Sequence, residues 1–299
     1  MTKITFLGTS QAVPTKEKNQ TAILLSYNSE NILIDCGEGT QRQFKIAGLN
    51  IMKINKILIT HWHGDHILGL PGLLQTMALG NYAKTLKIYG PTGTKRFIDL
   101  LLKLFIFRDK IKVDVQEIDK NGKFLDEKEF YLEAYKMKHQ APCLAYSFIE
   151  KDKRKLQMTY LKKLGVKNGP ILGKIQRGEK VKHNGKLISL EKATKLIPGK
   201  KFSFVLDTLY HPDCVNVAKN ADLLVTEACF LKDREDLAKE RSHLTAEQAA
   251  KIAKKAKAKK LIVTHISKRY DKKENLILKE AKKIFKNTEL AKDFTSFSY

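Results

Sequence analysis

Four potential metal ligands lie within six residues of the sequence, at His61, His63, Asp65 and His66. They follow an apolar run, residues 56–60, and precede a stretch that indicates a loop opening into a helix. Along an extended segment His61 and His63 point the same way, whereas Asp65 and His66 on the turn can face a second position. Imidazoles with a carboxylate and no nearby thiolate favour zinc in an open catalytic site over a closed structural one. The alternative is a solvated His-rich loop.

The chain is strongly basic. Its 299 residues carry a formal net charge of +24 and a sequence pI near 9.7, which indicates a polyanionic partner such as nucleic acid or a membrane surface. A Lys-rich surface also arises from a biased genome or from heat adaptation, so the charge alone leaves the partner open. The length allows one large or two small domains.

We expect a cytoplasmic protein. No apolar segment approaches membrane-spanning length, and the sequence begins with a strand-like run, residues 4–7, without a signal peptide. The four cysteines lack Cys-x-x-Cys spacing, which favours reduced thiols over a disulfide framework. They are Cys36, Cys143, Cys214 and Cys229.

Alternating and apolar runs predict a mixed α/β fold. Strands are expected at residues 4–7, 21–27, 31–36, 56–60, 86–89, 113–118, 130–137, 202–206, 222–226 and 260–264, and helices at 68–80, at 92–107 and from residue 246. The early strands arrive as hairpins, which argues for a mixed sheet and against a doubly wound one.

The composition changes between residues 151 and 200. This segment has fifteen Lys and Arg against three acids, several glycines and almost no aromatics. With little apolar material it should protrude from a main domain formed by residues 1–150 and 201–299. A basic projection of this kind neutralises phosphates without reading bases. A solvated loop without a partner is the alternative.

Two carboxylates end apolar strands. Asp207 follows residues 202–206, and a strand tip suits a metal-bridging aspartate because both of its oxygens must reach a shared site. Asp35 ends the second strand of the early hairpin, and we expect it to be a buried carboxylate that holds the metal loop by hydrogen bonds.

The pattern His-x-His-x-Asp-His at residues 61–66 resembles the signature of the metallo-β-lactamase superfamily, which implies a four-layer αββα sandwich with two metals at one edge of the paired sheets. Residues 37–43, Gly-Glu-Gly-Thr-Gln-Arg-Gln, resemble the hallmark of the ribonuclease Z family, endonucleases that trim the 3′ trailer from precursor tRNA. Residues 14–19 are similar to that family's Pro-x-Lys-x-Arg-Asn motif, with Lys18 in place of Arg, so the charge remains and the bidentate fork is lost.

The resemblance implies a complete site with two zinc ions. His61, His63 and His139 would hold one zinc, Asp65, His66 and His265 the other, and Asp207 would bridge them. Asp65 would also orient the attacking water or accept its proton. His243, paired with Glu227, would donate a proton to the leaving 3′ oxygen of the tRNA. In the family's His-Glu-Ala-Thr motif, this chain has Thr226 for His and Cys229 for Thr. His183 and His211 have no assigned role and are expected to be structural.

The basic segment resembles the flexible arm, or exosite, with which ribonuclease Z grips the body of tRNA. The positions expected to contact RNA are Lys162, Lys163, Lys167, Gly169, Pro170, Lys174 and Arg177. Contact with the sugar-phosphate backbone would recognise the shape of an A-form helix. The resemblance also implies a homodimer in which the arm of one subunit presents tRNA to the active site of the other. The products would be tRNA with a 3′-hydroxyl and a trailer with a 5′-phosphate.

Two other functions fit part of the sequence. A small-molecule hydrolase of the same superfamily, such as a thioesterase or lactonase, would share the metal loop but would not need the basic arm. A nucleic-acid binder that uses zinc only for folding would not need Asp65 or His243 for function. A redox di-iron relative fits less well, because those members carry a carboxylate where this chain has His63.

Overall fold

The strands of the chain pair into two large sheets in a computed structural model that describes residues 1–106 and 111–299. The first described sheet has seven strands in the order β18-β1-β2-β3-β4-β5-β6. They are β1 (Thr2–Gly8), β2 (Ala22–Tyr27), β3 (Glu30–Ile34), β4 (Lys56–Leu58), β5 (Thr85–Pro91), β6 (Lys112–Ile118) and β18 (Ser296–Ser298). Strands β3 to β6 are parallel, whereas β18, β1, β2 and β3 pair antiparallel.

The second described sheet also has seven strands, in the order β17-β16-β15-β14-β9-β8-β7. They are β7 (Gly122–Asp126), β8 (Phe130–Met137), β9 (Cys143–Glu150), β14 (Lys201–Val205), β15 (Leu223–Glu227), β16 (Leu261–Thr264) and β17 (Thr288–Leu290). Strands β14 to β17 are parallel to one another, and β9 pairs antiparallel with β14. Both sheets are therefore mixed, as the hairpin pattern predicts.

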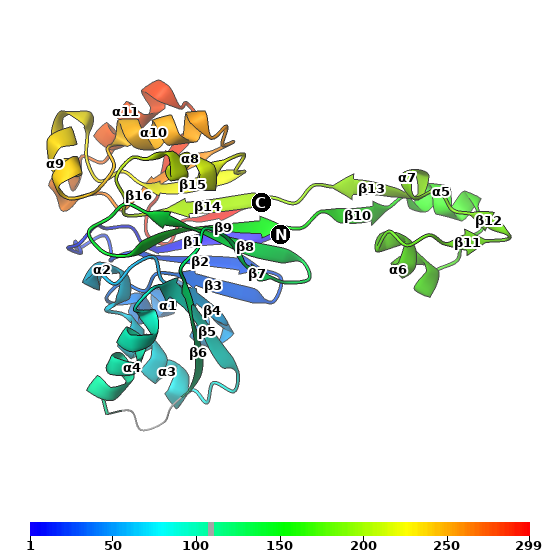
Figure 1. The fold of residues 1–299 in the computed structure, drawn as a ribbon, viewed down its shortest axis with the longest axis horizontal. Helices are drawn as coiled ribbons and strands as arrows, with labels where there is room; N and C mark the ends of the chain where they lie inside the picture. Colours follow the sequence, from blue (N-terminus) through cyan, green and yellow to red (C-terminus); the bar gives the residue numbers. More distant parts are fainter. Residues whose placement is uncertain (107–110) are drawn as a thin grey trace.

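Helices cover the outer face of each sheet (Figure 1). The first sheet carries α1 (Thr40–Ile46), α3 (Leu70–Leu79) and α4 (Thr94–Leu104), and the second carries α8 (Pro212–Ala218), α9 (Glu235–Glu240), α10 (Ala246–Lys255) and α11 (Asn275–Ile284). Short helical turns are α2 (Gly64–Ile67), η1 (Ile51–Lys53), η2 (Lys232–Arg234) and η3 (Lys268–Tyr270). This arrangement confirms the four-layer αββα sandwich.

Burial on both faces explains the apolar strands. In β2, Ile23 and Leu25 pack between the two sheets, whereas Ala22 and Leu24 pack under the helices of the outer layer. Alternate residues of a strand point to opposite faces, so a strand between two layers is apolar throughout. The space between the sheets is rich in aromatic rings, among them Phe130 and Phe148, which stack with centroids 4.8 Å apart.

The basic segment projects from the sandwich as a folded arm (Figure 1). Its stalk is the antiparallel pair of β10 (Lys153–Leu156) and β13 (Thr194–Ile197), and its knob contains α5 (Met158–Lys163), α6 (Pro170–Gln176), β11 (Lys182–His183), β12 (Lys186–Leu187) and α7 (Leu190–Ala193). The knob has its own small core of Leu161, Val166, Ile175, Val181, Ile188 and Ala193. The segment thus protrudes from the main domain, as its composition predicts, and a few aliphatic side chains suffice for the small separate core of its knob.

The sequence analysis did not identify eight of the described strands: β7, β9, β17 and β18 in the large sheets, and β10 to β13 in the arm. Strand β9 lies between β8 and β14 and is buried on both faces, so it lacks an alternating pattern. The helix predicted at 92–107 is shorter, since α4 ends at Leu104, and residue 107 lies outside the described residues. No described helix is long and apolar enough to cross a membrane. All four cysteines are buried and unpaired, as expected.

Candidate metal centre and active site

Ligand-type side chains from both sheets meet at one edge of the sandwich. Strands β14, β15 and β16 are parallel, so Asp207, Glu227 and His265, which end or follow them, share that edge. His139 lies in the β8–β9 connection and reaches the same edge because β9 runs antiparallel to β14. The metal loop follows β4 of the other sheet and completes the group.

Asp35 organises the metal loop. Its carboxylate accepts the Thr60 amide and hydroxyl, both at 2.7 Å, and Nδ1 of His66 at 2.6 Å. The Thr60 hydroxyl donates its hydrogen bond to Asp35. His61 Nδ1, 3.0 Å away, must therefore donate to the oxygen of that hydroxyl. In both histidines Nδ1 thus donates a hydrogen bond, and Nε2 is the atom that faces the clusters. Burial would lower the pKa of His66, but Asp207 and Asp35 raise it well above its ordinary value, so a metal ion would have to displace a proton from its Nε2. The expected role of Asp35 is confirmed.

The first cluster contains His61, His63, His139 and Asp207. His139 donates its Nδ1 proton to the Ser242 carbonyl at 3.0 Å, which leaves Nε2 facing His63 Nδ1 at 3.2 Å. His61 Nε2 is buried without a hydrogen-bond partner, 3.7 Å from Asp207 Oδ2. Burial lowers the pKa of His61 well below its ordinary value and also lowers the pKa of His139. Both are neutral at pH 7, the form that binds a metal.

The second cluster contains Asp65, His66 and His265. The Nε2 atoms of His66 and His265 are 3.1 Å apart, and Asp65 Oδ2 lies 3.5 and 3.4 Å from them. Asp207 Oδ1 approaches His66 Nε2 at 3.5 Å, whereas its Oδ2 faces the first cluster. The two oxygens of Asp207 are therefore divided between the clusters.

The donor set fits two metal ions. Imidazole nitrogens 3.1 and 3.2 Å apart approach the edge of about 3.3 Å of a tetrahedron with Zn–N bonds of roughly 2.0–2.1 Å. His61 Nε2 and Asp207 Oδ1 are buried without hydrogen bonds, which costs about 1–3 kcal/mol for each such atom unless a partner satisfies it. Burial would raise the pKa of Asp207, but His265, His66 and His243 hold it well below its ordinary value. Metal ions bound by these side chains would satisfy both atoms.

His243 and Glu227 form a buried pair at the rim of the clusters. His243 Nδ1 lies 3.2 and 3.1 Å from the two oxygens of Glu227, and Oε1 of Glu227 also accepts the Thr208 amide at 2.8 Å. Burial alone would lower the pKa of His243, but Glu227 and Asp207 outweigh it and raise the pKa to about 9. A protonated His243 next to the metal clusters can act as a general acid.

Four residues at the site were missed by the sequence analysis. A pocket of about 160 Å³ in front of the clusters is also lined by Gln11, Ala12, Gln140 and Arg241. The Ala12 amide donates to Asp65 Oδ2 at 2.8 Å and so orients that carboxylate. Arg241 stands two residues before His243 and is exposed. Arg241 could have been predicted from its position close to His243 in the sequence. Residues 11 and 12 reach this edge only through folding.

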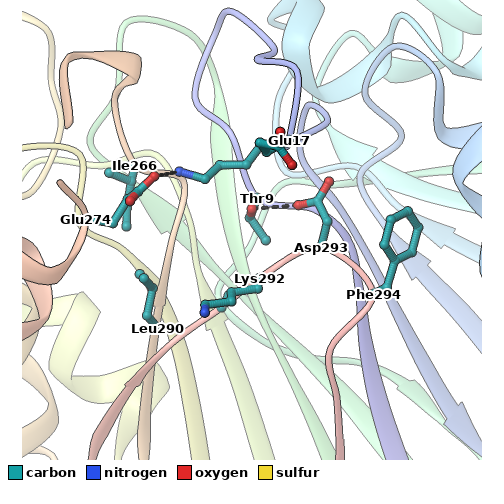
Figure 2. Close-up of a pocket in the computed structure, with 10 residues that line it drawn as sticks. Thr9, Glu17, Ile266, Glu274, Leu290, Lys292, Asp293 and Phe294 are labelled. Atoms are coloured by element: carbon teal, nitrogen blue, oxygen red, sulfur yellow. Dashed lines mark hydrogen bonds and ion pairs between the residues drawn. The ribbon is translucent and has the colours of Figure 1, made fainter. Parts of the chain in front are cut away.

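Hydrogen bonds to Asp293 hold the segment that carries Ala12. The Thr9 hydroxyl and the Asn19 amide donate to Asp293, each at 2.7 Å. Figure 2 shows the Thr9–Asp293 hydrogen bond and, across the same pocket of about 370 Å³, the carboxylate of Glu274. Glu274 pairs with the ammonium of Lys18. The ammonium group of Lys18 thus holds this segment through an ion pair, at the position where the family motif has Arg.

Comparison with known proteins places the chain in a family. Residues 2–149 match a family described as "Anti-Pycsar protein Apyc1", and residues 163–266 match one described as "Beta-lactamase superfamily domain". The Ribonuclease Z of Methanothermobacter thermautotrophicus is 38% identical over 98% of this chain and 95% of its own length. That of Bacillus cereus is 40% identical over 98% and 97%. The chain belongs to the ribonuclease Z family. It is therefore an endoribonuclease.

Solved structures agree with this family assignment. Human tRNase Z, short form, is 28% identical with a TM-score of 0.69, over 99% of this chain and 98% of its own. The metallo-β-lactamase fold protein YhfI from Bacillus subtilis is 20% identical with a TM-score of 0.70, over 99% and 98%, and supports the fold alone.

Cys229, where the ribonuclease Z motif has Thr, supports a candidate ligand. Its thiol donates to the backbone carbonyl of His265 at 3.0 Å and lies 3.3 Å from His265 Nδ1. Burial raises the pKa of Cys229 well above its ordinary value, so it remains a thiol. Thr226 is buried in β15. His183 lies in the arm and His211 precedes α8, and neither belongs to the clusters.

The arm positions compared with the ribonuclease Z exosite lie far from the clusters. All seven are exposed on the knob, and Arg177 pairs with Glu179 at 2.7 Å. The arm leaves the sandwich at the end of β9, whose first residue lies beside Asp207. Eight residues of strand span roughly 26 Å. The arm and the clusters are therefore at opposite ends of the sheet.

Proposed function

We propose that this endoribonuclease removes the 3′ trailer from precursor tRNA, cutting after the discriminator nucleotide. The products would be tRNA with a 3′-hydroxyl and a trailer with a 5′-phosphate. The observation that carries this proposal is the position of Asp207, whose two oxygens face two separate histidine clusters next to the protonated His243. This arrangement suits in-line displacement at a phosphodiester.

Two zinc ions would occupy the two clusters. His61, His63 and His139 would hold one and Asp65, His66 and His265 the other, with one oxygen of Asp207 for each. Zinc bound there supplies a water with a pKa of about 7 and neutralises charge on the phosphate oxygens. The orientation of the rings supports this assignment, because His61, His66 and His139 each use Nδ1 for a hydrogen bond and turn Nε2 toward the clusters.

Two side chains would transfer protons in this reaction. Asp65, held by the Ala12 amide, would orient the attacking water and accept its proton. His243 would donate its Nε2 proton to the leaving 3′ oxygen, and Glu227 would keep its other nitrogen protonated through the bond to Nδ1. The reaction would leave His243 neutral, and solvent would restore its proton.

The arm would bind the body of the tRNA. Its exposed positive residues would contact phosphates, with few contacts to bases. The expected contacts are Lys162, Lys163, Lys167, Gly169, Pro170, Lys174 and Arg177, all exposed. Because the arm and the clusters lie at opposite ends of the sheet, only an extended substrate or a second subunit can connect them.

We expect a cytoplasmic homodimer in which this connection is made between subunits. An apolar pocket of about 480 Å³ lies beside the metal loop, lined by Trp62, Leu68, Phe97, Leu100 and Leu104 among others. Leu68, Leu100 and Leu104 are 54%, 50% and 75% exposed, which is unusual for neighbouring leucines in a monomer. A second copy bound here would lie next to the clusters. Sedimentation of Leu100→Glu combined with Leu104→Glu should give a monomer, and an unchanged dimer would refute this interface.

Cleavage of an end-labelled precursor tRNA with a 3′ trailer tests the function. The zinc-loaded protein should cut once, after the discriminator nucleotide. A chelator and Asp65→Ala should each abolish the cut. A metal-replete protein that binds the precursor without cutting it would refute the endonuclease proposal and favour a nucleic-acid binder. Turnover of a thioester or lactone without cleavage of tRNA would favour a small-molecule hydrolase.

A further inference from the structure

A second pocket opens beside the metal pocket. It has a volume of about 380 Å³ and shares Gln11, Ala12 and Arg241 with the pocket in front of the clusters. Its other walls come from the loop after β15, from α9 and from the residues that follow His265. Its volume falls within the roughly 300–1,000 Å³ of sites for small ligands or single groups of a larger one. The two pockets are therefore adjacent, with Gln11, Ala12 and Arg241 bordering both.

The lining of this pocket suits an anion. Arg241, Lys268 and Arg269 contribute three cations, and no carboxylate lines it. Within the described part of the chain, Lys268 and Arg269 make no ion pair, and the contact of Arg241 with Glu240 is long, at 3.9 Å. Lys18, in contrast, is paired with Glu274. Unpaired cations that converge on one pocket are available for phosphate.

Apolar side chains lie between these cations. Val13, Leu237 and Phe230 line the same pocket, and Val13 is 44% exposed. An apolar wall with a cationic rim matches a nucleotide, which presents a flat base and a charged phosphate a few ångströms apart. A carbohydrate or a free anion would leave the apolar wall without a contact.

The position of His243 indicates which nucleotide of the precursor, relative to the cleaved bond, this pocket faces. Phe230, in the wall of this pocket, lies against His243 with ring centroids 6.2 Å apart. Arg241 belongs to the same loop as His243. The pocket therefore lies on the side of the site from which His243 would protonate the leaving oxygen. In the proposed reaction that oxygen is the 3′ oxygen of the tRNA.

We propose that this pocket binds the nucleotide on the tRNA side of the cleaved bond. Its base would lie against Val13 and Leu237, and Arg241 and Arg269 would bind the phosphates on either side of its ribose. This inference rests on the proposed function, since it names the part of the precursor that the pocket receives. It makes Val13 and Arg269 substrate-binding residues.

A pair of precursor tRNAs tests the base contact. The two differ only in the last nucleotide before the cut, which is intact in one and abasic in the other. With the wild-type enzyme, the abasic substrate should lower kcat/KM about tenfold, since one base contact is lost. With Val13→Ser, the ratio between the two substrates should fall below about twofold. Because the ratio is taken within one preparation, a misfolded fraction cancels.

A second comparison tests the phosphate contact. Arg269→Gln should raise the KM for the intact precursor about tenfold. Lys273→Gln is the matched control, because it removes the same charge from an exposed position four residues further on, outside the pocket, and it should change the KM less than twofold. Equal effects of the two substitutions would refute a specific contact.

The outcomes separate this inference from the proposed function. Failure of the wild-type enzyme to cut either precursor would overturn both. Efficient cutting of both precursors without an abasic penalty would overturn the pocket alone, as would an equal penalty in the wild type and in Val13→Ser. A penalty that disappears in Val13→Ser supports it.

Discussion

Replacement of Glu227 by Gln tests the role of the buried pair. Glu227 is fully buried, accepts the Thr208 amide at 2.8 Å and faces His243 Nδ1 with both oxygens. Glutamine has the same size, and its carbonyl can still accept the Thr208 amide. The substitution therefore removes the negative charge beside His243 and changes little else.

The size of the effect follows from the pKa of His243. Burial lowers this pKa, and Glu227 and Asp207 raise it from 6.5 to about 9. If loss of the Glu227 charge returns the pKa to about 6.5, the protonated fraction at pH 8 falls from about 90% to about 3%, or about 30-fold. A general acid must be protonated, so the loss of activity should grow as the pH rises and be small at pH 6.

The same shift predicts a change in stability. A histidine whose pKa is higher in the folded state stabilises the protein fully below its unfolded pKa near 6.5. This stabilisation is lost as the pH rises through the folded value of about 9. At 1.36 kcal/mol for each pKa unit it is at most about 3 kcal/mol. The free energy of unfolding of the metal-free wild type should thus decrease over this range, and that of Glu227→Gln should change less.

Two measurements check this prediction. Single-turnover cleavage from pH 6 to 9 gives the pH profile, and urea unfolding of the metal-free protein at the same pH values gives the stability. Glu247→Gln is the matched control, because Glu247 pairs with Lys232 and Lys251 on the surface, away from the clusters. A Glu227→Gln enzyme with normal metal content and the pH profile of the wild type would refute the assignment of His243 as the acid.

Three further predictions follow from other parts of the structure. Asp35→Asn should weaken zinc binding about 10- to 100-fold, because it loosens His66 and the metal loop. Calorimetric titration of the metal-free protein measures this, and an unchanged zinc affinity would contradict the role of Asp35. Lys162→Ala with Lys163→Ala should reduce the slope of log KM against log salt by about two, and an unchanged slope would mean that the arm makes no contact there. Leu161→Ala should destabilise the arm knob by about 2–5 kcal/mol, seen as faster hydrogen exchange in α5, α6 and α7 with the sandwich still protected.

Local pattern was enough to predict much of the candidate site. Residues 61–66 place four ligands next to one another in the chain, so their proximity needs no tertiary contact. Asp207 and His265 follow apolar runs that could be recognised as strands, and parallel strands bring such residues to a common edge. The sandwich could be predicted from the same runs together with the resemblance to a known superfamily.

Strand β9 and the arm show where local pattern fails. Strand β9 has apolar residues on both faces because it lies inside the sheet and between layers, and this burial is set by its neighbours. In the arm, the six core residues are spread over short elements with no regular period. A small core of this kind exists only once the chain has folded back on itself.

The sequence by itself determined the metal loop, the strong positive charge and the order of the elements, because each depends on residue type and on neighbours along the chain. Only the tertiary structure decided that His61, His66 and His139 turn Nε2 toward the clusters, since their Nδ1 atoms bond to Thr60, Asp35 and the Ser242 carbonyl. It also decided that Val13, Arg241 and Arg269 line one pocket. These residues are more than two hundred positions apart at the extremes, and only the packing of one sheet on the other brings them together.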